Sequence, residues 1–129
     1  MDMMESIKSY LLNKPKASEN FPFGAGVSVF KVNHKMFALL SLGNIDKQHP
    51  EKPPSWWLNL KCEPQEALML RDIFPAVRPG YHMNKLHWNT LILDGSIPQG
   101  EIERMIDNSF MLVVNNMSKK DQQAILLHL

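Results

Sequence analysis

The sequence contains a single cysteine, Cys62, so no intramolecular disulfide can form. A reducing compartment is therefore the default expectation. Long apolar runs are also missing, and the N-terminal segment offers only Tyr10-Leu11-Leu12, which is far too short for a signal peptide or a membrane span. Together these absences predict a cytoplasmic protein that does not enter the membrane.

The sequence also lacks a strong excess of charge. Its formal net charge is +1, whereas a nucleic-acid-binding domain usually has a strongly basic composition or a clear basic patch. The acids are unevenly placed, however, because none occurs between Glu19 and Asp46 or between Asp72 and Asp94. These gaps contain basic and histidine residues, namely Lys31, His34, Lys35, Arg78, His82, Lys85 and His87. A positive face would form if both gaps lie on one side of the fold.

Motifs typical of enzymes are missing as well. No glycine-rich phosphate loop, Gly-x-Ser-x-Gly elbow or His-Glu-x-x-His pattern occurs, and the carboxylates form no obvious pair. We therefore expect no catalytic residues and no cofactor. The length of 129 residues, with 44% hydrophobic and 21% charged residues, predicts one globular domain over residues 1–129 that needs neither metal nor disulfide to fold.

The first half of the chain is expected to contain a helix and a hairpin, followed by a surface loop. Asp2 can cap a helix that continues to about Asn13. β-Branched, aromatic and leucine residues at 27–42 predict two strands joined by Asn33-His34, because asparagine tolerates the positive φ of a tight turn. Residues 43–55 are rich in proline and charge and are predicted to form the loop. The hairpin would place Phe30 opposite Phe37.

Residues 56–62 alternate in the manner of a half-buried strand, with Trp57 on the wetter face. Pro64 fits the first position of a short helix that Glu63 caps and that ends at Phe74-Pro75.

Residues 78–89 are dense in aromatic, basic and amide side chains, and they are predicted to form a second hairpin around a two-residue turn, Asn84-Lys85. The direct cross-strand pairs would be Tyr81 with Trp88 and His82 with His87. In this arrangement Tyr81, Leu86 and Trp88 face the core, whereas His82, Asn84, Lys85 and His87 face outward.

Two helices are predicted to close the chain. Ser96-Ile97-Pro98-Gln99 fits a capping box, and an apolar stripe at helical spacing follows it. The stripe consists of Ile102, Ile106, Phe110, Val113, Val114 and Met117. Ser118 can start a short last helix in which Ile125, Leu126 and Leu129 pack back on the domain. The order of elements predicts an α/β (α+β) fold, with an antiparallel sheet covered by helices on one face and open on the other.

Several motifs, in this order, resemble the MmcQ/YjbR family. They are Lys35-Met36-Phe37-Ala38, Leu60-Lys61-Cys62-Glu63-Pro64, the run from Pro79 to Asn89, and Leu93-Asp94-Gly95-Ser96-Ile97-Pro98. The resemblance extends from the first helix to about Lys120, and it implies a CyaY-like (frataxin-type) fold. It also implies a proposed double-wing mode of DNA binding, in which two hairpins flank a helix-backed sheet. This chain departs from the family at the first turn, where such proteins often have glycine and it has Asn33-His34.

The candidate residues for binding nucleic acid or another ligand are His34, Lys35, Trp57, Lys61, Arg78, His82, Asn84, Lys85 and His87. In a DNA complex the cations would pair with phosphates, amide and imidazole groups would reach groove edges, and Trp57 could stack on an unpaired base. The same residues could instead be a solvated polar face, or a protein- or small-molecule-binding module that uses Trp57, Lys61, His82 and His87. The expected partner is double-stranded DNA, and the expected oligomeric state is a monomer or a weak homodimer.

A metal site and a reactive thiol are both disfavoured. His82 and His87 supply two ligands, whereas zinc needs three or four, so no metal is expected. Lys61 and a following helix N-terminus could activate the Cys62 thiol. The strand alternation instead places Cys62 with Leu58 and Leu60 on the buried side, where cysteine is a small hydrophobe.

Overall fold

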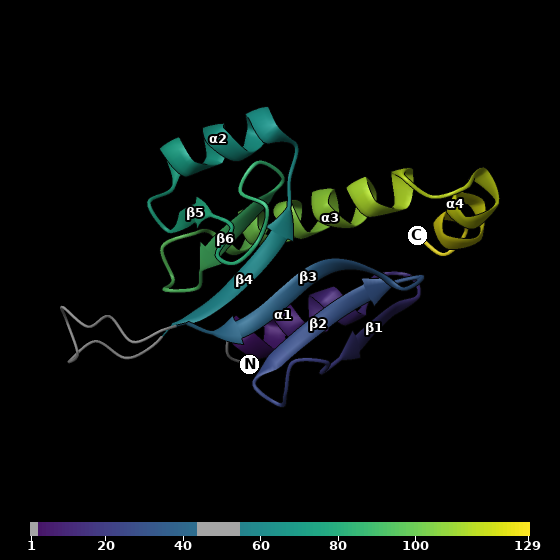
Figure 1. The fold of residues 1–129 in the computed structure, drawn as a ribbon, viewed down its shortest axis with the longest axis horizontal. Helices are drawn as coiled ribbons and strands as arrows, with labels where there is room; N and C mark the ends of the chain where they lie inside the picture. Colours follow the sequence, from purple (N-terminus) through teal and green to yellow (C-terminus); the bar gives the residue numbers. More distant parts are fainter. Residues whose placement is uncertain (1–2, 44–54) are drawn as a thin grey trace.

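The computed structural model describes residues 3–43 and 55–129, which form four helices and one six-stranded sheet (Figure 1). In chain order the elements are α1 (Met3–Leu12), β1 (Ala17–Asn20), β2 (Val27–Val32), β3 (Lys35–Leu42), β4 (Trp56–Lys61), α2 (Pro64–Ile73), β5 (Val77–Pro79), β6 (Trp88–Ile92), α3 (Gln99–Asn115) and α4 (Lys119–Leu126). The predicted cap Asp2 and residues 44–54 of the predicted surface loop lie outside the described residues.

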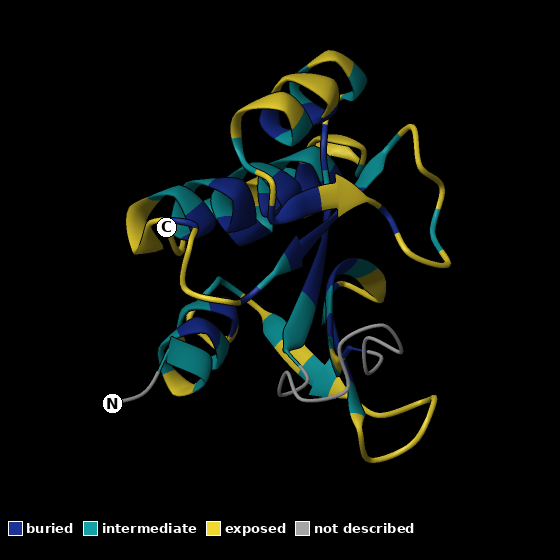
Figure 2. Cartoon of the chain, turned by 90° about the vertical axis from the view of Figure 1, so that its left-hand side faces the viewer, coloured by how far each residue is buried: buried dark blue, intermediate teal, exposed yellow. Residues whose placement is uncertain are grey.

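The sheet is antiparallel throughout, with the strand order β1-β2-β3-β4-β6-β5. The helices lie on one side of it, and the opposite side carries exposed loops (Figure 2). This arrangement confirms the predicted α/β fold with helices on one face. The uncovered side of the sheet is called the open face below.

The hydrophobic core lies between the sheet and the helices. Helix α3 runs across β2, β3 and β4 and buries the predicted stripe from Ile102 to Val114, whereas Met117 lies beyond its end and is partly buried. The Phe110 ring of α3 meets Phe37 edge to face with ring centroids 5.4 Å apart. Helix α1 contributes Ile7 and Leu11 to the same core. Its Tyr10 hydroxyl donates to Asp107 at 2.8 Å, so a polar contact also joins α1 to α3.

Strand β1 was absent from the predicted order of elements. Its sequence, Ala-Ser-Glu-Asn, has low β-propensity and no apolar alternation, so composition gave no signal for a strand. It pairs along β2 at the edge of the sheet. Glu19 pairs with Phe30 and therefore faces the helices, where its carboxylate lies 3.6 Å from the Lys8 ammonium.

The first hairpin has the predicted two-residue turn, since Asn33 and His34 have φ values of 46° and 66°. The predicted pairing of Phe30 with Phe37 is wrong, however. A register shift makes Phe30 pair with Ala38, which leaves Phe37 as the extra residue of a β-bulge. Phe37 and Ala38 are both fully buried, so the bulge lets two consecutive residues of β3 enter the core.

The second hairpin differs from the prediction. Strands β5 and β6 pair only as far as Pro79 with Asn89, and residues 80–87 form a longer loop in place of a two-residue turn. The predicted pairs Tyr81–Trp88 and His82–His87 therefore do not form. Two local hydrogen bonds favour the loop: Gly80 N–H donates to the Trp88 carbonyl at 2.9 Å, and the Asn84 side chain accepts from Leu86 N–H at 2.9 Å.

The predicted inward side of this segment is also wrong, whereas His82, Asn84 and Lys85 are exposed as predicted. Tyr81 is 43% exposed and Leu86 is 59% exposed, so neither fills the core. Trp88 pairs with Lys61 on the open face and is half-buried. The core-facing residues of this part of the chain are Leu91 and Leu93 instead.

Helix boundaries follow the predictions in two of three cases. Glu63 caps α2 by accepting from Gln65 N–H and Glu66 N–H, and Ser118 caps α4, so both predictions are confirmed. The predicted capping box at Ser96 is wrong, because its hydroxyl donates to Asp94 at 2.6 Å and α3 begins later without a side-chain cap. Leu129 was predicted to pack on the domain but is exposed.

Candidate binding site on the open face of the sheet

The open face carries no acidic strand residue within the described part of the chain. The strand registers place these residues on it: Ser18, Asn20, Val27, Val29, Lys31, Met36, Leu39, Ser41, Trp57, Asn59, Lys61, Arg78, Trp88, Thr90 and Ile92. Glu19 of β1 is the one acidic residue in the described strands, and the alternation of the strand turns its side chain to the helical side of the sheet. Lys31, Lys61 and Arg78 are therefore the charged strand residues of this face.

A buried polar pair lies at the centre of the open face. Asn59 of β4 and Thr90 of β6 are direct cross-strand neighbours and are only 3% and 2% exposed. The Thr90 hydroxyl accepts from Tyr81 N–H at 2.8 Å and lies 2.5 Å from Asn59 Oδ1. The hydroxyl donates to Asn59 Oδ1, so Thr90 both binds Asn59 and anchors the loop at Tyr81.

A pocket of about 430 Å³ opens over this pair. It is lined by Phe23, Val27, Met36, Leu39, Ser41, Asn59, Tyr81, His82 and Met83. The sheet supplies the floor, and the loops at residues 21–26 and 80–87 reach over it from opposite ends of the strands. Most of the lining is apolar, and none of these residues is acidic, so the pocket suits an apolar or anionic guest.

Three aromatic rings cluster at the end of the pocket formed by the 80–87 loop. The Tyr81 ring meets the Trp57 indole edge to face at 5.1 Å, and its centroid lies 4.0 Å from the His82 ring. His82 has a φ of 57°, which is uncommon for a residue other than glycine. Gly43 makes room for the indole, because an added Cβ would lie 2.2 Å from Trp57 Nε1.

The predicted site residues are therefore only partly brought together. Trp57, Lys61 and Arg78 lie on the open face, and His82 lines its pocket. His34 and Lys35 lie apart from them, at the tip of the β2–β3 hairpin.

The remaining candidates have structural contacts in the 80–87 loop. Lys85 Nζ donates to the Gly80 carbonyl at 3.2 Å, and Asn84 accepts from the backbone as described above. The His87 carbonyl accepts from Cys62 N–H at 2.8 Å. Lys85 and Asn84 thus stabilise the loop from within, and His87 joins it to the residue that follows β4.

Arg71 of α2 was missed at the sequence level, although it holds the same loop from the helical side. Its Nε donates to Asn89 Oδ1 at 2.7 Å, and its Nη2 donates to the carbonyls of Lys85 and, at 3.4 Å, Trp88. Asn89 in turn donates to the Ala67 carbonyl at 3.3 Å. No local sequence signal marks Arg71, because its partners lie 14 to 18 residues further along the chain.

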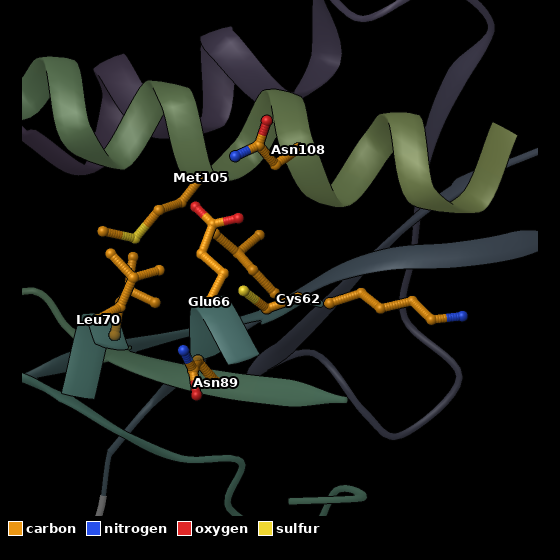
Figure 3. A pocket seen from close by; sticks show the side chains of 9 residues that line it. Cys62, Glu66, Leu70, Asn89, Met105 and Asn108 are labelled. Carbon is orange, nitrogen blue, oxygen red and sulfur yellow. The ribbon is translucent and has the colours of Figure 1, made fainter. Parts of the chain in front are cut away.

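The surroundings of Cys62 argue against a reactive thiol. Cys62 is buried, as predicted, beside a cavity of about 10 Å³, which is about the space that one water needs (Figure 3). Burial, and then the carboxylates of Glu66 and Glu63, raise the pKa of the thiol to about 11. At neutral pH the thiol is protonated, and the thiolate that would act as nucleophile is scarce.

Metal and membrane features are also absent from the described part of the chain. No three His, Cys, Asp or Glu side chains within residues 3–43 and 55–129 converge as a metal site would need. Across the same residues, no helix has the length and apolar character to cross a membrane.

The fold places the chain among small α/β proteins whose antiparallel sheet is covered by helices on one face. Residues 12–112 match the family model described as YjbR, so the chain belongs to the YjbR family. The predicted family is thereby confirmed.

Relatives cover nearly the whole chain. Escherichia coli O157:H7 protein YbdF is 34% identical over 94% of this chain and 92% of its own length. Escherichia coli K12 protein YjbR is 28% identical over 95% of this chain and 97% of its own. Both are described as uncharacterized. The crystal structure of the DUF419-domain protein DR2400 from Deinococcus radiodurans has a TM-score of 0.81 at 30% identity, covering 97% of this chain and 88% of that one.

Proposed function

We propose that this chain is a non-enzymatic binding protein that takes a small ligand in the open-face pocket. The observation that carries this proposal is a concave, largely apolar pocket with the buried Asn59, held by Thr90, at its floor. Ligand sites commonly measure about 300–1,000 Å³ and combine apolar walls with a few fixed polar groups. The volume of about 430 Å³ falls within that range.

The chemistry around the pocket supports binding without catalysis. Among the described residues, His82 is the one imidazole in the lining, and none of them supplies a carboxylate there that could orient it as a general base. Cys62 faces the helical side with a raised pKa, away from this pocket.

A fragment screen by protein-observed NMR tests the proposal. We expect hits that shift the signals of pocket residues, above all Leu39, Asn59 and Met83. Leu39→Trp should fill the pocket and abolish these hits, whereas Leu68→Trp, on the exposed side of α2, should leave them unchanged. The proposal fails if a folded Leu39→Trp protein binds the same fragments with unchanged affinity, or if no fragment shifts a pocket signal.

DNA is the second candidate partner, in the double-wing mode that the family resemblance implies. The observation that favours it is the acid-free open face with Lys31, Lys61 and Arg78. The β2–β3 turn and the 80–87 loop also project from the same end of the sheet, because Lys61 of β4 pairs with Trp88 just after that loop. Two projections at one end could follow the two sides of a groove.

Charge reversal tests this second function. Duplex binding should weaken steeply with salt through counterion release, and Lys35→Glu with Lys61→Glu should abolish it. Lys119→Glu with Lys120→Glu on α4 changes the net charge equally, far from the open face, and should have a much smaller effect. Binding that does not respond to salt, or that both double variants weaken alike, contradicts the double-wing mode.

A further inference from the structure

We infer that the open-face pocket recognises a flat aromatic carboxylate, whose ring lies on the apolar floor and whose carboxylate accepts hydrogen bonds from the Asn59 amide. The inference rests on the proposed small-ligand function, since it names the class of ligand for the same pocket. Three independent features carry it: a hydrogen-bond donor open to the pocket, the charge of the face, and the shape of the walls.

The donor is Asn59 Nδ2. The Thr90 hydroxyl accepts from Tyr81 N–H and donates to Asn59 Oδ1, which leaves Nδ2 as the donor end of the amide. No described residue accepts from Nδ2, and Nδ2 is not among the atoms sealed from solvent, so this donor is open to the pocket that Asn59 lines. A ligand that displaces water from this donor loses affinity unless it brings an acceptor, so the position favours a ligand that carries one.

The charge of the face favours an anionic acceptor. Lys61 follows Asn59 by two residues on the same face, about 7 Å further along the strand. Arg78 pairs with Thr90, which pairs with Asn59, so a second cation lies in the same row across the sheet. No acidic strand residue of the described chain opposes them on this face. A carboxylate at Asn59 would therefore sit in a positive field.

The walls favour a flat ring. Val27, Met36 and Leu39 present an apolar surface from adjacent strands. Aromatic side chains stand at both ends of it: Phe23 comes from the 21–26 loop, and Tyr81 comes from the 80–87 loop. Phe23 is largely exposed in the free protein, so a ring bound in the pocket would cover apolar surface that water now contacts. A volume of about 430 Å³ holds one or two fused rings but not a folded peptide.

A matched series of three probes tests the inference at constant ionic strength: indole-3-carboxylate, indole and 3-(aminomethyl)indole. Isothermal titration calorimetry gives the affinities, and NMR shifts of Leu39, Met83 and the Asn59 side-chain amide locate the site. We expect the carboxylate to bind at least tenfold more tightly than indole, and the cationic amine to bind most weakly. Equal or tighter binding of indole or of the amine overturns the inference.

Variants separate the role of the donor from that of the pocket. Asn59→Asp removes the donors and adds a negative charge, so it should cost the carboxylate at least tenfold in affinity and change indole binding little. Because Asn59 also holds Thr90, Lys61→Gln provides a second variant that leaves the floor intact, and it should weaken the carboxylate severalfold without affecting indole. If neither folded variant discriminates between the two probes, the donor and charge argument is wrong.

The ligand class and the small-ligand function can be refuted separately. Neutral or cationic compounds that bind in the pocket more tightly than the carboxylate would refute the ligand class and leave the small-ligand function standing. Probes and fragments that all leave the pocket signals unmoved would refute the proposed function itself.

Discussion

Ser109 tests how much the hydrogen bonds between helix α3 and the sheet contribute to stability. It is fully buried on the apolar side of α3 and reaches the sheet at the β3 bulge. Its hydroxyl accepts from Lys61 N–H at 2.9 Å and donates to the Phe37 carbonyl at 2.6 Å. The regular β3–β4 pairs end at Ala38 with Leu60, so the hydroxyl occupies the position where the bulge interrupts the ladder.

Ser109→Ala removes one oxygen and leaves a backbone N–H and a backbone C=O without that partner. Each unsatisfied buried group costs about 1–3 kcal/mol, so with some relaxation we expect a total loss of about 2–4 kcal/mol in the free energy of unfolding. Urea unfolding followed by circular dichroism measures it. With an m-value of about 2 kcal/mol/M, the middle of the usual range, the midpoint should fall by about 1–2 M.

Ser9→Ala is the matched control. Ser9 is exposed on α1, and alanine is the better helix former, so this variant should be as stable as the parent or stabler by a few tenths of a kcal/mol. A loss below about 1 kcal/mol for Ser109→Ala would refute the reasoning, because it would mean that water or a shifted backbone satisfies both groups as well as the hydroxyl does.

Three further predictions concern other contacts. Arg71→Ala should lower the free energy of unfolding in urea by about 2–4 kcal/mol, because it leaves the buried Asn89 acceptor unpaired. Arg78→Ala loses one exposed contact to a carbonyl and should cost less than about 1 kcal/mol. Equal losses would contradict the role of Arg71 in holding the 80–87 loop. Native Cys62, with a pKa of about 11, should react with iodoacetamide at pH 8 roughly a hundredfold more slowly than the unfolded chain; equal rates would show that the thiol is accessible and ionised. Burial and the bond to Asp107 raise the pKa of Tyr10 from 10.0 to about 12. The stability that the protonated hydroxyl contributes is therefore complete below pH 10 and is lost as the pH rises towards 12. Tyr10→Phe should make the free energy of unfolding fall less between pH 10 and 12, and an unchanged pH profile would argue against this role of Tyr10.

The sequence determined the elements whose signals are local. The apolar stripe of α3 needs only the helical period, and the turn at Asn33-His34 needs only residues that tolerate positive φ. Glu63 caps α2 through the backbone of the next three residues. Each of these features depends on atoms within one or two turns of chain, which is why a pattern of residues could predict it.

The second hairpin depended on distant contacts, and the prediction failed there. Asn84-Lys85 has the composition of a tight turn, but Tyr81 N–H is taken by Thr90 and the Lys85 carbonyl by Arg71. Those partners come from β6 and α2, and they hold the 80–87 loop in another shape. Local turn propensity is worth less than several hydrogen bonds made by buried or charged groups.

In the candidate site, too, some features follow from local sequence and others depend on distant contacts. The alternation of β4 placed Trp57, Asn59 and Lys61 on one face from sequence alone. Only the tertiary structure placed Thr90 beside Asn59 and brought two loops over the pocket, because the strand order and registers depend on long-range packing. Periodicity fixes the face on which a side chain lies, whereas its neighbours on that face are fixed by which strands pair and in which register.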